Sequence, residues 1–292
     1  MTEEGEQRVF SSSALSHPSS ATERLSMNDS TKRKAVVVTG ASDGIGAELA
    51  RLFAAKGGEV ALVARRKDRL EALANEIAAA GAKRPLVVAL DLCEPGADAR
   101  LEQALNEAGL GVEFLINNAG FGLIGPMLTL DAAEQLAIVD LNVRALTALT
   151  LRFLPQIVAT KGGVLNVASV AGFMPGPNFT VYYATKAYVV SFTEALAQEM
   201  APLGVKVSCL CPGPVTTGFQ ARAGFELSGT MAAVKPALLP AAEVARQGYE
   251  GLAAGKRVVV PGLANKLMLA LVRLTPRAML LPTLAFAQNG RK

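Results

Sequence analysis

The amino-acid sequence predicts a single α/β domain in which helices cover both faces of a parallel β-sheet. Over residues 35–262, short β-branched or apolar segments alternate with segments of helical periodicity, which is the pattern of strands joined by crossover helices. No internal repeat or linker interrupts the alternation. Hydrophobic residues make up 51 % of the 292-residue chain and charged residues 18 %, so the chain can fill the large core that this fold needs.

The first strand and helix are the most clearly patterned. Residues 35–39 read Ala-Val-Val-Val-Thr, an unbroken run that suits a strand buried on both faces. Apolar residues at helical spacing follow, with charged residues on the opposite side, until Gly57 and Gly58 end the helix. The same alternation then predicts strands at 60–64 and 86–90 and helices at 67–80 and 97–108.

The second half of the chain continues this pattern to residue 260. Further strands are expected at 114–116, 163–167, 205–210 and 257–260, which brings the number of strands to seven. Helices are expected at 131–154, 181–201 and 241–254. The sequence therefore predicts a doubly wound parallel sheet of seven strands.

Cysteine and histidine are too scarce for several kinds of site. The chain has three cysteines, Cys93, Cys209 and Cys211, and one histidine, His17. These counts exclude a disulfide scaffold and a zinc cage, so we expect no metal. His17 lies in the N-terminal tail, so no core histidine serves in catalysis. The cysteine usage fits a reducing, cytoplasmic compartment.

Both ends of the chain differ from the central domain. Residues 1–33 are polar and rich in serine, and we expect a disordered tail, or translation that starts at Met27. Residues 256–292 hold seven Lys or Arg and no Asp or Glu, although the net charge of the whole chain is +4. The extension 263–292 is apolar, but its longest uncharged run spans 13 residues, short of the about 20 that a membrane span needs.

A glycine-rich turn follows the first strand and opens the first helix. It reads Thr-Gly-Ala-Ser-Asp-Gly-Ile-Gly from Thr39 to Gly46. Glycine lets the backbone turn tightly and approach a pyrophosphate, whose charge is favoured at a helix N-terminus. Alone, such a turn also fits a plain tight connection. In its strand–helix context it predicts a dinucleotide site formed by Gly40, Ser42, Asp43, Gly44, Ile45 and Gly46.

Four polar residues in the second half form a candidate catalytic group. Tyr182 and Lys186 are four residues apart, so they share one helix face. A tyrosine with its ordinary pKa of about 10 is a poor base at neutral pH, and a nearby cation lowers that pKa. Ser169 ends the fifth strand thirteen residues before Tyr182, and Asn142 lies within the long helix 131–154. The adjacent Tyr183 lacks a lysine four residues later, so Tyr182 is preferred.

The order and spacing of these motifs resemble the short-chain dehydrogenase/reductase family over about residues 35–262. The G-x-x-x-G-x-G turn is similar to the shorter, non-extended type of this family, and Asn117-Asn118-Ala119-Gly120 follows the fourth strand as it does there. The resemblance implies a Rossmann fold, a nicotinamide cofactor and redox chemistry between carbonyls and alcohols.

The resemblance also implies a role for each residue of the catalytic group. Tyr182 would exchange a proton with the substrate oxygen, and Ser169 would hydrogen-bond the same oxygen. Lys186 would lower the pKa of Tyr182 and bind the nicotinamide ribose. Asn142 would position a water that relays protons to Lys186.

The end of the second strand indicates NADP(H). Ala64 stands where the family's NAD-binding members carry Asp, and Arg65 follows, suited to pair with a 2′-phosphate. Alternatively, Arg65 only starts a solvated helix. Asp43 departs from the Lys or Arg that many NADP-binding members carry before the second glycine. The resemblance adds further cofactor contacts: Asp91 at the adenine, Asn118 in the cofactor pocket, and Pro212, Val215 and Thr217 at the nicotinamide.

The segment 218–239 resembles the mobile substrate lid of the family. Apolar residues in it and elsewhere predict an apolar substrate: Phe219, Phe225, Leu227, Met231, Phe121, Met174, Pro175 and Phe179. The alternative is that these residues pack between lid and body.

The extension 263–292 allows two interpretations. Leu263, Leu267 and Leu271 recur at helical spacing, together with Ala270 and Leu274, and Lys266 and Arg273 lie on another face. The apolar face either packs on the core or a second subunit, or contacts a membrane surface. The resemblance implies a homo-oligomer.

We therefore predict an NADP(H)-dependent oxidoreductase that reduces a carbonyl or oxidises a secondary alcohol of an apolar or lipid-like molecule. Its parts are a tail (1–33), a Rossmann domain (34–262) and a basic apolar extension (263–292). We expect no nucleic-acid partner, and a location in the cytoplasm, with or without membrane contact. The alternative is a catalytically silent, cofactor-binding regulatory or scaffold protein of the same fold, against which the complete catalytic group argues.

Overall fold

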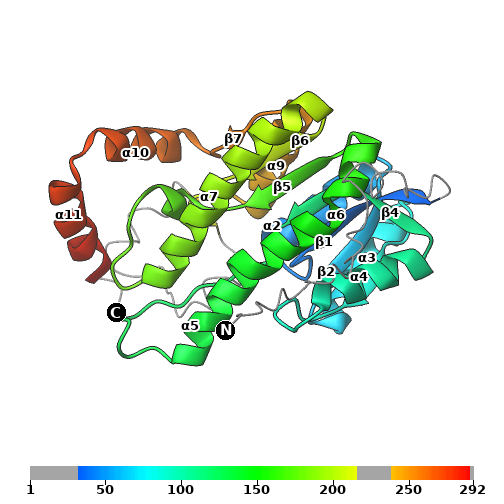
Figure 1. Ribbon diagram of the computed structural model, residues 1–292, viewed down its shortest axis with the longest axis horizontal. Helices are drawn as coiled ribbons and strands as arrows, with labels where there is room; N and C mark the ends of the chain where they lie inside the picture. Colours follow the sequence, from blue (N-terminus) through cyan, green and yellow to red (C-terminus); the bar gives the residue numbers. More distant parts are fainter. Residues whose placement is uncertain (1–31, 216–237, 290–292) are drawn as a thin grey trace, which may run out of the picture.

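The computed structural model describes residues 32–215 and 238–289. Its centre is an all-parallel sheet of seven strands in the order β3-β2-β1-β4-β5-β6-β7 (Figure 1). The predicted doubly wound, parallel α/β fold is confirmed. The strands are β1 (Arg33–Thr39), β2 (Glu59–Ala64), β3 (Leu86–Ala89), β4 (Leu110–Asn117), β5 (Gly163–Val167), β6 (Lys206–Leu210) and β7 (Val258–Val259).

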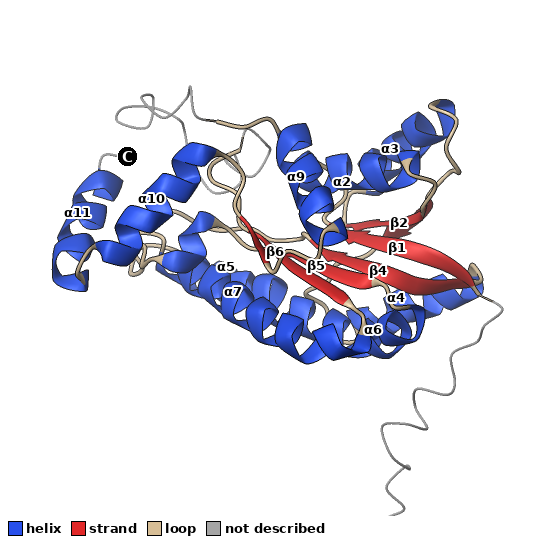
Figure 2. Cartoon of the chain, turned by 90° about the horizontal axis from the view of Figure 1, so that it is seen from above, coloured by secondary structure: helices blue, strands red, loops and turns tan. Residues whose placement is uncertain are grey.

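Helices cover both faces of the sheet (Figure 2). One face carries α2 (Gly44–Ala55), α3 (Lys67–Ala79) and α9 (Ala241–Ala253), and the other carries α4 (Ala97–Glu107), α6 (Leu146–Thr160) and α7 (Thr180–Met200). Strand β1 shows why its sequence is an unbroken apolar run. Val36 and Val38 pack with the first group of helices, whereas Ala35 and Val37 pack with the second, because successive side chains point to opposite faces.

The carboxyl ends of the strands create the place for a ligand. The chain runs outward from β1 to β2 and β3 on one side and from β4 to β7 on the other. In open α/β sheets, ligands bind outside the carboxyl ends of the strands where the strand order reverses. Here that point lies between β1, which ends at Thr39, and β4, which ends at Asn117.

The helix expected over 131–154 forms as three consecutive segments. These are α5 (Ala132–Val139), a π-helical segment η1 (Asp140–Ala145) and α6. Asn142 lies in the π-helical segment and bonds to the backbone of Phe121 at both ends of its amide, at 2.9 and 3.1 Å. Such wide turns interrupt α-helices frequently at functional sites.

Other boundaries differ from the prediction by a few residues. Helix α6 continues past Pro155 to Thr160, because Phe153 and Ile157 on either side of the proline are fully buried against the sheet. Strand β4 begins at Leu110 rather than at 114. Strand β7 is reduced to two residues because it pairs with β6 at only two positions.

Two helices follow the last strand. Helix α10 (Leu263–Leu274) packs against the 3-10 turn η2 (Val170–Phe173), and α11 (Arg277–Asn289) continues the chain. The α10 leucines singled out above are exposed, so they do not pack into the core of this chain. Within 32–215 and 238–289, no helix combines the length and the hydropathy that crossing a bilayer requires.

Candidate active site

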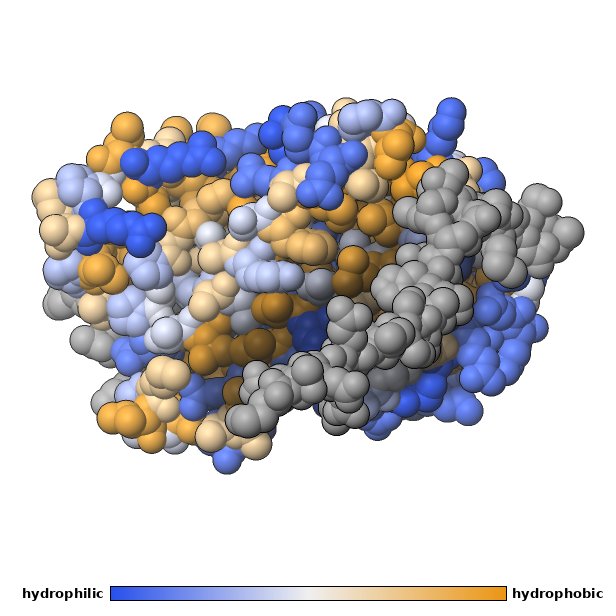
Figure 3. Space-filling view, in the orientation of Figure 1, coloured by the Kyte–Doolittle hydropathy of each residue, from blue (hydrophilic) through white to orange (hydrophobic). Residues whose placement is uncertain are grey.

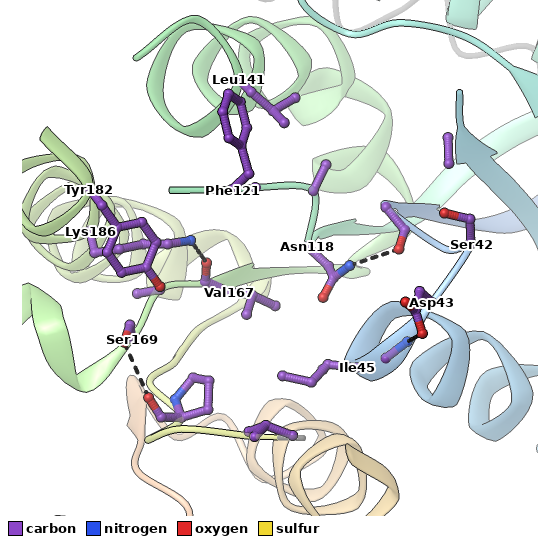
Figure 4. Close-up of a pocket in the computed structure, with 18 of the residues that line it drawn as sticks. Ser42, Asp43, Ile45, Asn118, Phe121, Leu141, Val167, Ser169, Tyr182 and Lys186 are labelled. Carbon is purple, nitrogen blue, oxygen red and sulfur yellow. Dashed lines mark hydrogen bonds between the residues drawn. The ribbon is translucent and has the colours of Figure 1, made fainter. Parts of the chain in front are cut away.

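A cavity of about 760 Å³ opens at the carboxyl edge of the sheet. Figure 4 shows Ser42, Asp43 and Asn118 toward one end of it and Ser169, Tyr182 and Lys186 toward the other. The loops after β1, β2, β4, β5 and β6 all contribute to its lining. Residues that are far apart in the sequence therefore line one cavity.

The glycine turn is held by Asn118. The side-chain amide of Asn118 donates to the carbonyl oxygens of Thr39 (2.9 Å) and Gly40 (3.2 Å). A Cβ atom on Gly46 would lie 2.5 Å from the carbonyl oxygen of Gly40, so no side chain fits there. Gly40, Ser42, Asp43, Gly44 and Ile45 line the cavity, whereas Gly46 has a packing role behind it.

Asp43 caps the helix that begins at the turn. Its carboxylate accepts from the backbone N–H of Gly44 at 2.7 Å and forms an ion pair with Arg69 at 3.8 Å. A negative charge at this end of α2 is stabilised by the helix dipole. The departure of Asp43 from the family pattern is thus accommodated by a cation one helix away.

Three arginines surround the far end of the cavity, which is the end at Ser42 and Asp43. Arg65 forms an ion pair with Asp91 at 3.6 Å, and Arg66 donates to the Ser42 hydroxyl at 3.0 Å. Arg66 and Arg69 were not predicted as site residues, although both line the cavity with Arg65. The available signal was their spacing, since Arg69 lies one helical turn beyond Arg65 and Arg66.

The candidate catalytic residues Ser169, Tyr182 and Lys186 lie together at the opposite end of the cavity, the near end. Lys186 is buried, donates to the carbonyl oxygen of Val167 at 2.8 Å, and lies 5.7 Å from the centre of the Tyr182 ring. Ser169 Oγ donates to the Pro212 carbonyl at a long 3.3 Å and accepts from the N–H of Ala171 at 3.1 Å. The side chain of Asn142 bonds to Phe121 and Thr185, so its amide braces the loop after β4 against α7.

Burial controls the ionisation of Tyr182 and Lys186. It raises the pKa of the Tyr182 phenol well above its usual value, against the smaller effect of the hydrogen bond with Ser169, which lowers the pKa. It lowers the pKa of the Lys186 ammonium to about 8. The expected lowering of the Tyr182 pKa by Lys186 is not seen: burial raises that pKa, and the group that lowers it is Ser169. Tyr182 is therefore protonated at neutral pH.

The loop after β6 contributes the residues that were predicted to contact the nicotinamide. Pro212 and Val215 line the cavity, and the backbone of Pro212 accepts from the N–H of Val170 at 2.9 Å. This bond ties the loop after β6 to the turn that carries Ser169. Thr217 lies outside the described residues.

Aromatic and aliphatic side chains lie around Tyr182 and line the cavity. Phe179 stacks on Tyr182 with ring centres 4.4 Å apart and an angle of 16°. A Cβ atom on Gly122 would lie 2.5 Å from Phe179 and 2.7 Å from Tyr182, so glycine is needed for the stack. Phe121 and Phe179 line the cavity as expected, but Met174 and Pro175 do not. Lining residues that were not predicted include Ile124, Ala137, Leu141 and Tyr183.

The predicted lid lies almost entirely outside the described part. Of segment 218–239, only residues 238 and 239 are described, and Leu239 pairs with Val215 through an isolated bridge. Phe219, Phe225, Leu227 and Met231 are among the residues not described.

Known proteins match both the sequence and the fold. The family model for short chain dehydrogenases matches residues 34–226. A short chain dehydrogenase of Pseudocercospora fijiensis is 38 % identical over 206 residues, which cover 68 % of this chain and 65 % of that protein. The matched region thus spans slightly less than two thirds of that relative's length.

Three solved structures illustrate the likeness. A short-chain dehydrogenase from Sphingobium yanoikuyae in complex with NADPH has a TM-score of 0.71 and 33 % identity, and covers 79 % of this chain and 89 % of its own. A bulky-bulky ketone specific alcohol dehydrogenase from Comamonas testosteroni has a TM-score of 0.68 and 29 % identity (84 % and 94 %). A 3-ketoacyl-(acyl-carrier-protein) reductase from Brucella melitensis complexed with NADH has a TM-score of 0.69 and 30 % identity (80 % and 98 %).

The matched sequence includes the glycine turn and runs past the residues that meet at the near end of the cavity. The Sphingobium and Comamonas proteins resemble this chain in fold. Their sequences are also 33 % and 29 % identical to it, so the likeness is not confined to the fold. The chain belongs to the short-chain dehydrogenase/reductase family.

Proposed function

We propose that this protein is an NADP(H)-dependent oxidoreductase that reduces a carbonyl, or oxidises a secondary alcohol, of an apolar small molecule. The observation that carries the proposal is one cavity with the glycine turn and three arginines at one end and Ser169, Tyr182 and Lys186 at the other. A nucleotide bound along it would end beside a buried acid/base group.

The cavity fits a nicotinamide dinucleotide. Its volume of about 760 Å³ lies within the usual range of ligand pockets, roughly 300–1,000 Å³. The α2 N-terminus with Ser42 and Ile45 would hold the pyrophosphate. Lys186 would bond the ribose, while Pro212 and Val215 would contact the nicotinamide. The bound cofactor would supply or accept the hydride.

The protein's own part in the reaction is the movement of one proton. In carbonyl reduction, the Tyr182 hydroxyl donates its proton to the substrate oxygen, and burial keeps that hydroxyl protonated beforehand. The Ser169 hydroxyl donates a second hydrogen bond to the oxygen as negative charge develops there. Its long bond to Pro212 is readily exchanged for this stronger one. In alcohol oxidation the same groups act in reverse.

Three cations favour NADPH over NADH. Among residues 32–215 and 238–289, the three arginines form ion pairs with two carboxylates: Arg65 with Asp91 and Arg69 with Asp43. The cluster keeps an excess of positive charge for a 2′-phosphate. Arg66 is the best placed of the three for this role because it already reaches the glycine turn at Ser42. The NADPH complex of the Sphingobium protein supports this choice, although the Brucella protein was complexed with NADH.

An apolar, bulky substrate suits the near end. Phe121, Ile124, Leu141 and Phe179 line it beside Tyr182. The similarity to an alcohol dehydrogenase specific for bulky ketones supports the same substrate class here.

Two contacts of the folded protein belong to the proposal. Leu151 on α6 and Tyr188 on α7 are exposed to 67 % and 38 %, and we propose that they join copies of the chain in a homo-oligomer.

We also propose peripheral membrane contact through the extension 263–292, whose basic and apolar composition suits a bilayer surface.

The cofactor assignment is tested by titrating the protein with NADPH and NADH and following nicotinamide fluorescence. We expect tighter binding of NADPH. Arg65→Ala and Arg66→Ala each remove charge-assisted bonds of about 1.5–3 kcal/mol, so the Kd for NADPH should rise by roughly ten- to a hundredfold and the Kd for NADH far less. Arg84→Ala, a surface change at the Glu71 ion pair, is the control. Equal losses for both cofactors would contradict the assignment.

The acid/base assignment is tested by Tyr182→Phe on a panel of apolar ketones and aldehydes. Removal of the donor should lower kcat by at least about a hundredfold while NADPH still binds. Tyr249→Phe, which packs against Phe53 away from the cavity, should retain turnover. If Tyr182→Phe keeps most of its turnover, this role is wrong. A wild-type protein that binds NADPH but turns over no carbonyl would support the silent, cofactor-binding alternative.

A further inference from the structure

Helix α10 presents apolar side chains on two sides. Met268, Leu269 and Val272 face the body of the protein, and Leu269 is buried to 6 % exposure. Leu263, Leu267, Leu271 and Leu274 form a second row, spaced by four, four and three residues, with exposures of 72, 59, 66 and 82 %. This spacing puts them on one stripe of the helix. In the space-filling view, hydrophobic residues lie beside hydrophilic ones over α10 and α11 at the upper left (Figure 3).

Four leucines exposed in one row are unusual on a folded protein. Single exposed apolar residues are normal, but a contiguous patch marks a surface that another apolar phase covers. Helix α11 extends the patch with Met279 and Leu281, which are exposed to 65 % and 42 %.

The charges beside the patch have one sign. Lys266, Arg273 and Arg277 are exposed on the same two helices, and no Asp or Glu follows Glu250 in the sequence. The Arg273 guanidinium lies over the ring of Phe173, 5.9 Å from its centre, which holds its charge beside the helix. A row of leucines flanked by cations matches the surface of an anionic bilayer, which offers acyl chains beneath negative headgroups.

A second copy of the chain is a poorer match. Two copies joined through this patch about a two-fold axis would bring the same patch against itself. The three cations of one copy would then face those of the other without acidic partners from α10 or α11. Charge complementarity therefore favours lipid.

We propose that the exposed face of α10 and α11 docks the protein on bilayers that contain anionic lipids. The helices lie in the interface and do not cross the membrane. The four leucines enter the acyl boundary, while Lys266, Arg273 and Arg277 contact lipid phosphates.

The docking face lies next to the reaction site. Helix α10 packs on η2, whose residues Val170 and Ala171 line the cavity beside Ser169. Asn265 of α10 closely approaches Gly213, which also lines the cavity, since a Cβ there would lie 2.5 Å from the Asn265 side chain. If the proposed function holds, a docked enzyme takes its apolar carbonyl substrate from the bilayer rather than from water.

Vesicle flotation tests the docking. The full chain is mixed with vesicles of phosphatidylcholine alone or of phosphatidylcholine with about 30 % phosphatidylglycerol, and floated on a density gradient. We expect at least about a fivefold preference for the anionic vesicles. L267Q/L271Q should abolish flotation, and K266Q/R277Q should remove the preference for anionic lipid.

Matched controls separate docking from general damage. Leu203→Gln changes an exposed leucine elsewhere (47 % exposed), Lys256→Gln changes an exposed cation outside the patch, and both should float like the wild type. Melting temperature and NADPH binding should be unchanged in every variant. Wild-type protein that floats with neither vesicle, or L267Q/L271Q protein that floats normally, would overturn the proposal.

Sedimentation velocity tests whether a second copy of the chain, and not lipid, covers the leucine patch. If L267Q/L271Q converts an oligomer to monomers and the wild type does not float, the patch joins copies of the chain and the proposal is wrong. Flotation does not depend on turnover. A protein that floats but reduces no ketone therefore counts against the proposed function and leaves the docking in place.

Discussion

Burial moves the ionisation of Tyr182 and Lys186 in opposite directions. Both side chains are buried at the end of the cavity, and each is pushed toward its neutral form. The phenol is thereby kept ready as an acid. The ammonium of Lys186, with its pKa lowered to about 8, is within reach of losing its charge near neutral pH. The charge that would bind a ribose is thus sensitive to pH.

Cofactor affinity should therefore depend on pH through Lys186. As pH rises through about 8, the folded protein loses the Lys186 proton, and the Kd for NADPH should increase by up to about tenfold per pH unit. Fluorescence titrations between about pH 6 and 10 measure this. Lys186→Met should bind NADPH weakly at every pH, without this rise. A wild-type Kd that stays flat across the range would contradict the assignment.

Lys186 also makes the free energy of unfolding depend on pH. Below about pH 8 both the folded and the unfolded chain hold the Lys186 proton. Between about 8 and the ordinary value of 10.5, the unfolded chain binds a proton that the folded chain has released. This group therefore raises the free energy of unfolding as pH rises through that window.

Among the site residues, those with a motif of their own could be predicted. Tyr182 and Lys186 are fixed by their spacing on one helix, and Gly40 and Gly44 by the turn, where both adopt positive φ. The spacing of Arg65, Arg66 and Arg69 indicates a cluster, but it could not show that Arg66 is the one that reaches the glycine turn, because this depends on side-chain direction. Leu141 and Ile124 were also missed, since nothing in their local sequence distinguishes them from core residues.

At the scale of the elements, a ladder of buried polar side chains crosses the core beneath the candidate active site. Asn117 on β4 donates to Asn166 on β5 at 2.9 Å and to Thr150 on α6 at 3.1 Å. Asn166 in turn donates to Thr193 on α7 at 3.0 Å. Since Asn117 precedes Asn118 and Asn166 precedes Val167, the ladder fixes the strand ends that hold the glycine turn and Lys186.

Asn166→Val should destabilise the protein. The change leaves the buried Asn117 amide without one of its partners, and an unsatisfied buried group costs about 1–3 kcal/mol. Urea denaturation monitored by circular dichroism measures the loss. The exposed Asn75, bonded only to Arg84 among the described contacts, provides the control Asn75→Ala, which should change stability by less than about 0.5 kcal/mol. A similar small effect at Asn166 would show that the ladder is dispensable.

Elements with clear local boundaries were predicted best. Strand β5 runs over 163–167 as expected, because Gly162 precedes it and Ala-Ser follows it. The π-helical segment at Asn142 could not be predicted, because it depends on contact with Phe121, 21 residues away. The two-sided character of α10 was equally hidden, since the sequence shows leucines on two faces but not which face the protein covers.

At the scale of the whole molecule, the cavity joins parts of the chain that are otherwise separate. Its lining extends from Gly40 after β1 to Val215 after β6. It therefore draws on both of the helix layers that cover the sheet. A ligand bound along the cavity would contact both halves of the fold. The unfolded chain has no such cavity, so the ligand would bind the folded state alone.

NADPH should accordingly raise the melting temperature of the whole protein. At a free concentration of about 100 times Kd, binding adds about 2.7 kcal/mol to the free energy of unfolding. For a chain of this size that corresponds to a shift of roughly 5–10 °C, measured by differential scanning fluorimetry. NADH at the same concentration should give a smaller shift, because it lacks the phosphate that the three arginines attract. Arg66→Ala should reduce the NADPH shift toward that of NADH and leave the unliganded melting temperature nearly unchanged, since the bond from its guanidinium to Ser42 is exposed. Equal shifts for the two cofactors in the wild type would show that the arginine cluster is a solvated surface rather than a phosphate site.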